Sequence, residues 1–127
     1  MLKTILYIAI GGAIGSVLRF LTTVLVSKFC PENSGFQFPL ATFIANVIGC
    51  FLIGLFLGIL AKNELTDSNL KWFLVTGFCG GFTTFSAFGM ENFNLLQNNN
   101  TLLAFSYIAL SIILGLFAVW FGLFVTK

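Results

Sequence analysis

The sequence predicts an all-α membrane protein in which one domain, residues 1–127, crosses the bilayer four times. Hydrophobic residues make up 58% of the chain and charged residues 8%, whereas a soluble domain carries about 25% charged residues. Four apolar stretches also exceed the roughly 20 residues that a transmembrane helix needs, and the segments between them are short. These observations exclude a soluble globular domain, a disordered chain and a nucleic-acid-binding protein.

The first span is predicted over about residues 2–29, and it contains Arg19. An arginine at the centre of a span costs about 2.5–3.5 kcal/mol on insertion scales, so its presence needs a reason. Its side chain could extend to the nearer interface, contact carbonyl groups at a helix end, or provide a positive field for an anion.

The second span is predicted over about residues 38–61, and Thr42 and Asn46 are its two polar interruptions. They are four residues apart, so both side chains lie on one helical face. Asn46 could hydrogen-bond to a neighbouring helix, or it could donate a hydrogen bond to a passing solute.

The third span is predicted over about residues 70–96, and its middle is irregular. Gly77 and Gly80 are followed by Thr83 and Thr84, where an uninterrupted helix would be expected. A helix broken at membrane depth is tolerated only where protein or a wet cavity covers it. The broken ends would favour anions at N–H groups and cations at released carbonyls. A glycine kink packed against a neighbouring helix is the simpler alternative.

The fourth span is predicted over about residues 101–125, where Tyr107 and Ser111 are four residues apart on one face. With four spans, both termini lie on the same side of the membrane. That side carries four lysines, and the opposite side carries Lys28. The positive-inside rule then predicts cytoplasmic termini, although the bias is small enough for insertion in either orientation.

Small residues recur at four-residue spacing, which lets helix backbones approach closely. Four thin helices enclose little interior of their own, so an oligomer is expected. The pairs are Gly11 and Gly15, Gly12 and Ser16, Gly54 and Gly58, and Gly77 and Gly81.

The aromatic residues suggest how an anion could be bound without strong charges. Phe accounts for 17 residues, against two Trp and two Tyr, and interfacial belts do not explain this excess. Phe82 and Phe85 flank Thr83 and Thr84, and on a helix they would project from nearly the same face. The positive edge of a phenyl ring could stabilise a small anion. Hydroxyl groups of the two threonines and of Ser86 could add donors.

Enzymatic chemistry is not expected. The chain has no His, and membrane hydrolases need a nucleophile paired with a base. Cys30, Cys50 and Cys79 form no CxxC motif, so they are interpreted as small buried thiols.

Three segments resemble motifs of the CrcB (Fluc) family of fluoride channels. They are GGAIGSVLRF at 11–20, TFIANVIGC at 42–50 and GFCGGFTTFSAF at 77–88. The resemblance covers the whole chain in length and span count, and the third motif is the most specific. It implies a passive fluoride-selective ion channel in the cell inner membrane that exports fluoride and so reduces its toxicity. It also implies an antiparallel, dual-topology homodimer with two pores and a third helix broken mid-membrane. A pair of different, oppositely oriented subunits is the alternative assembly.

The resemblance also assigns roles to individual positions. Asn46 would donate to fluoride, Phe82 and Phe85 would form a pair of ring edges, and Arg19 would lie near a pore entrance. Backbone carbonyls of Gly77 and Gly80 would bind a structural sodium ion at the dimer centre. Gly80 stands where family members often have Thr, but a carbonyl ligand needs no side chain. A polar track that takes over the ion would consist of Thr83, Thr84, Tyr107 and Ser111, with Ser86 beside it.

Two other functions remain open on the sequence alone. A small four-helix, proton-coupled multidrug exporter has a similar length, but it needs a membrane-embedded carboxylate in its first span. Here Glu91 in the third span would have to serve. A helper subunit without transport activity, within a larger membrane complex, is the other alternative.

Overall fold

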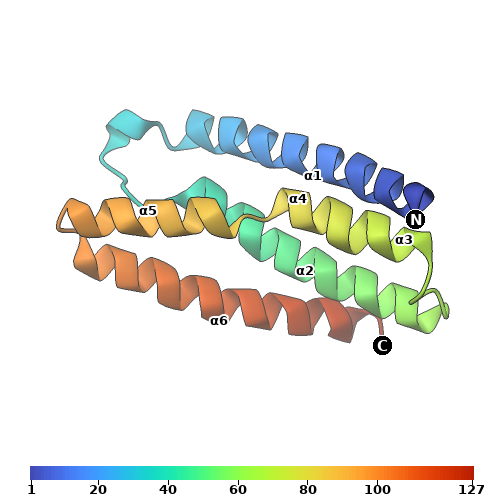
Figure 1. The fold of residues 1–127 in the computed structure, drawn as a ribbon. Helices are drawn as coiled ribbons and strands as arrows, with labels where there is room; N and C mark the ends of the chain where they lie inside the picture. The colour runs from blue at the N-terminus through green and yellow to red at the C-terminus, as the bar shows by residue number, and fades with distance from the viewer.

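The computed structural model describes residues 1–127, apart from the side chain of Glu32, and it confirms the all-α prediction (Figure 1). Four helical segments are long and apolar enough to cross a membrane, as the sequence predicted. They are α1 (Leu2–Phe29), α2 (Leu40–Lys62), a third span over Asn69–Gln97, and α6 (Thr101–Val125). A short 3₁₀ turn, η1 (Glu32–Ser34), lies between α1 and α2.

The third span consists of several helical pieces. It starts with α3 (Asn69–Lys71), continues as a π-helical stretch, η2 (Trp72–Cys79), and then as α4 (Gly80–Phe82). Thr83 and Thr84 follow with extended backbone, and α5 (Phe85–Gln97) completes the span. The glycines of this segment lie within helical backbone, so the two threonines are the residues that leave it. We call them the link.

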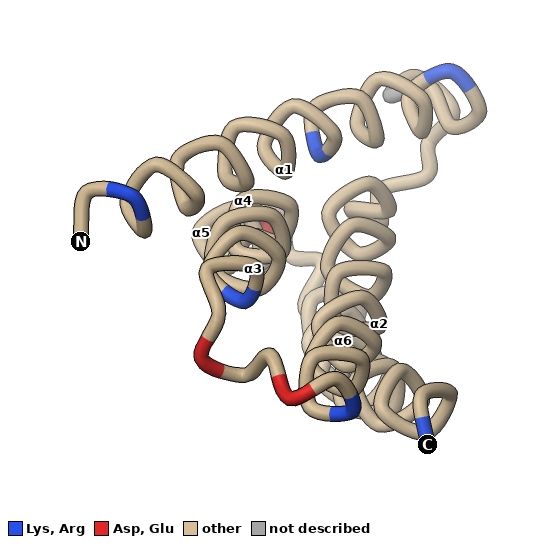
Figure 2. Tube along the Cα trace, turned by 90° about the vertical axis from the view of Figure 1, so that its right-hand side faces the viewer, with Lys and Arg blue, Asp and Glu red and all other residues tan. Residues whose placement is uncertain are grey.

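The helices form two packed pairs. α2 packs mainly against α6, and α1 packs mainly against η2 and α4. The two chain termini lie at the same end of the molecule, as four crossings require (Figure 1). Most charged residues lie near helix ends, whereas Arg19 lies within α1 and Glu91 within α5 (Figure 2).

Glycines allow α1 to touch the third span through its backbone. A Cβ atom on Gly77 would lie 2.8 Å from the Ile8 carbonyl oxygen and 3.1 Å from Gly11 Cα. A Cβ atom on Gly15 would lie 2.8 Å from the Phe82 nitrogen. The predicted close packing is therefore confirmed, and these contacts form within one chain.

The α2–α6 pair uses glycines in the same way. A Cβ atom on Gly122 would lie 2.7 Å from the Leu55 nitrogen, and one on Gly54 would meet the Val119 carbonyl. Because these glycines already pack inside the chain, their spacing does not by itself indicate a second copy.

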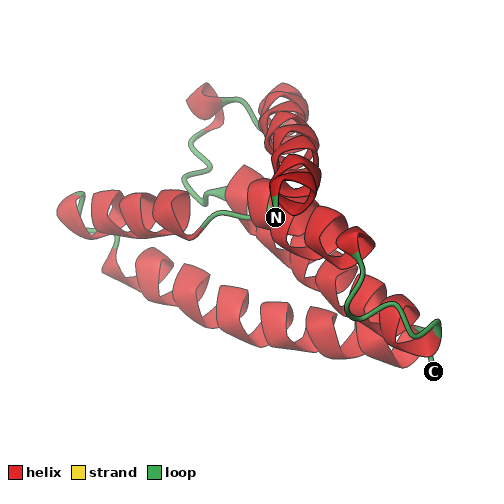
Figure 3. Ribbon diagram, turned by 45° about the vertical axis from the view of Figure 1, so that its right-hand side comes forward, coloured by secondary structure: helices red, strands yellow, loops and turns green.

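The best-buried cluster lies between α5 and α6. Tyr107 and Ala104 are fully buried there, and Leu95 is almost so. Phe38, Phe43 and Phe88 pack around the Tyr107 ring, with centroid distances of 5.0–6.4 Å. Elsewhere each span exposes large apolar side chains, as expected for helices surrounded by lipid or by another chain. Figure 3 shows the long helices splayed rather than gathered around one central core.

Candidate functional site

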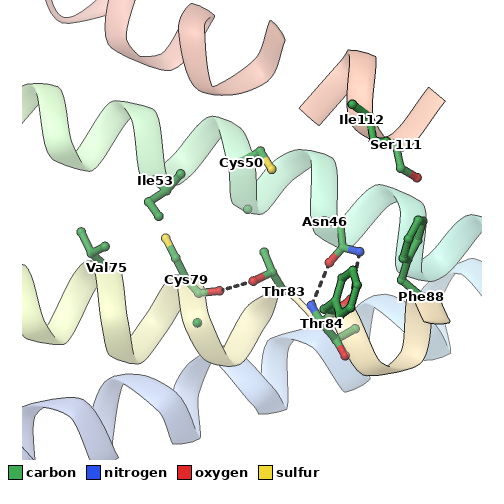
Figure 4. A pocket seen from close by; sticks show the side chains of 13 residues that line it. Asn46, Cys50, Ile53, Val75, Cys79, Thr83, Thr84, Phe88, Ser111 and Ile112 are labelled. Carbon is green, nitrogen blue, oxygen red and sulfur yellow. Dashed lines mark hydrogen bonds between the residues drawn. The ribbon is translucent and has the colours of Figure 1, made fainter. Parts of the chain in front are cut away.

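Asn46 on α2 holds the backbone of the link. Its Nδ2 donates to the Thr84 carbonyl at 3.1 Å, and the Thr84 N–H donates to Asn46 Oδ1 at 2.8 Å (Figure 4). The Thr84 N–H needs an acceptor, so this pairing fixes which way the amide points. The Asn46 amide has two N–H groups, and the second is left for another acceptor.

The two threonines of the link end one helix and begin the next. The Thr83 hydroxyl donates to the Cys79 carbonyl at 2.8 Å, within the last turn of helical backbone. The Thr84 hydroxyl accepts from the Ala87 N–H at 3.2 Å, and so caps α5 as threonine commonly does. Ser86 Oγ lies 3.2 Å from Thr84 Oγ1. The link is thus an ordered structure.

The link also changes the surroundings of the Gly80 carbonyl. In a continuous α-helix the Thr84 N–H would donate to this carbonyl oxygen, but here it donates to Asn46. The Gly80 carbonyl therefore loses its usual helical partner. Among the described residues, no group of three or more His, Cys, Asp or Glu could hold a metal ion.

A pocket of about 410 Å³ opens beside Asn46. Residues of α2, the third span and α6 line it, and it brings several of the predicted site residues together (Figure 4). Among its lining residues are Asn46, Gly80, Thr83, Thr84, Phe85 and Ser111.

The two predicted phenylalanines occupy different environments. Phe82 is 6% exposed and stacks on Phe78, with ring centroids 6.0 Å apart. Phe85 begins α5 and is 84% exposed. The expectation that both rings project from one helical face is wrong, because the extended link separates the helices that carry them. Both residues still flank the link, and Phe85 lines the pocket.

Several buried polar atoms lack a partner, and one of them belongs to Ser111, which lines this pocket. Among the described residues, the Tyr107 hydroxyl, Ser111 Oγ and Glu91 Oε1 make no hydrogen bond. An unpaired buried polar group costs about 1–3 kcal/mol, so such atoms indicate water or a ligand. The Tyr107 hydroxyl and the Glu91 carboxyl group are neighbours, so Ser111 Oγ is the clearest of these indications.

Glu91 belongs to this group, and the sequence motifs did not include it among the fluoride-pathway residues. Its carboxyl group lies near the hydroxyls of Thr42 and Tyr107. Glu91 follows Thr84 by seven residues, which is two helical turns, so the helical period of α5 could have associated it with the link. It also lines a second cavity of about 480 Å³ with the amide side chains of Gln37, Asn94, Asn98 and Asn100.

Arg19 is half-buried and lines a third cavity of about 200 Å³. Thr84 of the link and Thr42 of α2 line the same cavity, and Ser16 and Thr23 contribute further hydroxyls from α1. Arg19 therefore borders a small polar space that adjoins the link.

Comparisons with known proteins agree with one another. Residues 6–123 match the family model described as "CrcB-like protein, Camphor Resistance (CrcB)". A Flavobacterium psychrophilum protein named fluoride-specific ion channel FluC is 55% identical over 126 residues, which cover 99% of this chain and 98% of that protein. A protein of the same name from Campylobacter fetus is 51% identical over 98% of this chain and 94% of its own length. Another protein of this name, from Azobacteroides pseudotrichonymphae, is 47% identical over 100% of this chain and 98% of its own length.

Proposed function

This chain belongs to the CrcB-like family, and we propose that it is a passive fluoride-selective channel that exports fluoride and so lowers its toxicity. Its relatives named fluoride-specific ion channel match it over nearly their whole length. The chain is therefore a channel protein rather than an enzyme. The multidrug-exporter alternative receives no support from these comparisons.

The observation that carries the proposal is the pocket that Asn46 lines together with the buried, unpaired hydroxyl of Ser111. Fluoride holds its water strongly, so a pathway must replace that water with closely placed donors. Ser111 lines the pocket, and its hydroxyl makes no hydrogen bond within the described chain. The second Asn46 N–H is a further donor. Neutral donors release an ion more readily than cationic ligands do.

The phenyl rings beside the link supply a weaker kind of contact. Phe85 is largely exposed and lines the pocket, while Phe82 is held in place by stacking on Phe78. We expect their ring edges, which carry partial positive charge, to contact fluoride as it passes. The hydroxyls of Thr83, Thr84 and Ser86 continue the polar track.

Arg19 provides the positive field at one entrance. Its cavity shares Thr84 with the Asn46 pocket, so an anion attracted there is already beside the link. Glu91 lies near Tyr107 and near Thr42, which also lines the Arg19 cavity. The cavity that Glu91 lines is bordered by amide side chains, which suits an aqueous vestibule.

We also propose a structural sodium ion bound by backbone carbonyls of Gly77 and Gly80. Support comes from the Gly80 carbonyl, whose usual helical donor is taken by Asn46. Sodium is a hard cation and prefers oxygen ligands, so carbonyl groups suit it. The ion would lie at the dimer centre, where its charge would offset repulsion between anions.

The proposed assembly is an antiparallel, dual-topology homodimer in the cell inner membrane, with the link inside the bilayer. A polar backbone link at that depth must be covered by protein or water rather than lipid. One chain leaves Phe85 84% exposed next to the link, so a second copy is the partner that we expect to cover it. Pairing with a different, oppositely oriented subunit is the less favoured arrangement.

Growth of fluoride-sensitive bacteria tests the function. Expression of this chain in a strain that lacks its own fluoride exporter should restore growth in fluoride, and it should not change sensitivity to quaternary ammonium dyes. An Asn46→Asp variant present at the same level in the membrane is the control, and it should not restore growth. Dye resistance without fluoride resistance would favour the exporter instead.

A further inference from the structure

Phe88 is a third phenylalanine close to the link, and the fluoride pathway described above gives it no role. It lies on α5 and lines the Asn46 pocket together with Phe85 and Ser111. Figure 4 shows Phe88 at the same end of the pocket as Asn46 and Ser111. Phe82, which the sequence pattern pairs with Phe85, is not among the residues that line this pocket.

The helical register of α5 makes Phe85 and Phe88 neighbours. This helix is continuous from Phe85 to Gln97, so residues three apart lie on one face. The two rings have centroids 5.9 Å apart and planes tilted by 35°. The extended link instead separates Phe82 from Phe85, and the Phe82 ring stacks on Phe78. The ring pair that the sequence predicts at residues 82 and 85 is therefore present at residues 85 and 88.

Packing against α6 restricts the orientation of the Phe88 ring. Its centroid lies 5.0 Å from that of Tyr107, and the two planes are tilted by 62°. Tyr107 is fully buried and also contacts Phe38 and Phe43, so it cannot move aside without disturbing a packed cluster. Phe85 is largely exposed in one chain. Phe88 is therefore the better-fixed of the two rings that line the pocket.

We propose that Phe88 is a further ring contact for fluoride, and that Phe85 and Phe88 form the ring pair at the Asn46 pocket. This role rests on the channel function proposed above. The edge of a phenyl ring carries partial positive charge, so it attracts an anion while holding it less tightly than a cationic side chain does. The Asn46 amide and the unpaired Ser111 hydroxyl line the same pocket. An anion there has neutral donors and ring edges in one lining.

Two changes at position 88 separate the charge of the ring edge from the packing of the ring. Phe88→Leu removes the ring. Pentafluorophenylalanine, introduced at position 88 by nonsense suppression, keeps the ring but places partial negative charge at its edge, because fluorine withdraws electrons. The leucine variant should lower fluoride efflux from loaded liposomes by about two- to tenfold, and the pentafluorinated protein should lower it at least as much. The Tm of each protein in detergent reports whether it is folded.

Phe93 provides a matched control on the same helix. It is largely exposed, and it is not among the residues that line the three cavities described above. The same two changes at position 93 should leave fluoride efflux as fast as that of the unmodified protein.

Unchanged efflux in the protein with pentafluorophenylalanine at position 88 would overturn the ring-edge role. This holds even where Phe88→Leu is impaired, because the ring would then matter only for packing. Equal losses at positions 88 and 93 would also overturn it. Absence of fluoride efflux from the unmodified protein would instead refute the channel function, and the role of Phe88 would fall with it.

Discussion

Asn46 connects the fold to the proposed function at the scale of a single residue. The nitrogen and the oxygen of its amide group both hydrogen-bond to the Thr84 backbone. Asn46 therefore stabilises the link, around which the other hydrogen-bond donors lie. Its remaining N–H is the one proposed to reach fluoride. These two roles can be separated by substitution.

Asn46→Ala removes both hydrogen bonds to Thr84 and leaves part-buried backbone groups unpaired. This should cost about 1–3 kcal/mol and lower the Tm of the protein in detergent. Asn46→Asp keeps an acceptor for the Thr84 N–H but removes the donor and adds a negative charge. It should lose fluoride flux while keeping more of its stability than the alanine variant. An alanine variant as stable as the parent would contradict the structural role, and an active aspartate variant would contradict the donor role.

Phe82→Ile and Phe85→Ile should each reduce fluoride efflux from loaded liposomes by about two- to tenfold, because aromatic edge interactions are worth roughly 0.5–1.5 kcal/mol. Phe82 is buried and stacked, so its variant should also be less stable. Phe85 is exposed in a single chain, so its variant tests the ring edge with little effect on the folding of that chain. Phe117→Ile is the control, since Phe117 is 56% exposed on α6. Unchanged efflux in both test variants would defeat the ring-edge role.

At this scale the sequence predicted which residue types could matter but not how they are arranged. Asn46 stood out as an amide in an apolar span, yet its partner lies 38 residues away in the chain. Phe82 and Phe85 were expected on one face because a helical period was extended across the link. Thr83 and Thr84 have extended backbone, so the helical spacing does not continue from Phe82 to Phe85. The periodicity of apolar residues in a sequence does not reveal such a two-residue interruption.

At the scale of the helices, backbone contact between α1 and the third span positions the link. Gly15 lies against the Phe82 nitrogen, one residue before the link begins. The spacing of small residues predicted close packing, and the structure shows which helices it joins. The irregular middle predicted for the third span is narrower in the structure: Thr83 and Thr84 have extended backbone, whereas Gly77 and Gly80 remain helical.

Gly15→Ala should therefore destabilise the protein, because its new methyl group would meet the backbone of the third span. The expected loss is about 1–3 kcal/mol, seen as a lower Tm in detergent, with reduced fluoride flux as the link shifts. Gly12→Ala is a matched control on the same helix. Its methyl group would lie 3.7 Å from the Gly77 carbonyl oxygen, which is an ordinary contact. Equal Tm values for the two variants would show that the α1 contact does not position the link.

At the scale of the whole molecule, one chain leaves much apolar surface for lipid or a second copy to cover. The four spans were predictable within a few residues, because span length and hydropathy follow from composition. The residues alone did not determine the partner chain or the orientation in the membrane. The lysine bias is small, and the glycines spaced four apart make their contacts within one chain.

Dual topology predicts that chains insert in both orientations. In a variant in which all three cysteines are replaced by serine, Lys127→Cys places one thiol at the end of the molecule that carries both termini. A membrane-impermeant maleimide should label part of the chains in intact spheroplasts and the remainder only after permeabilisation. Thr101→Cys, at the start of α6 and the opposite end of that helix, should give the complementary pattern. Complete labelling, or none, in intact spheroplasts would indicate a single orientation.

Ion efflux from proteoliposomes that contain only this chain tests the central claim most directly. Vesicles are loaded with equal concentrations of potassium fluoride and potassium chloride, a potassium ionophore starts efflux, and ion-selective electrodes follow each anion. The account predicts rapid fluoride efflux and chloride release no faster than from protein-free vesicles. Chloride efflux as fast as that of fluoride, or no fluoride efflux from correctly folded protein, would contradict it.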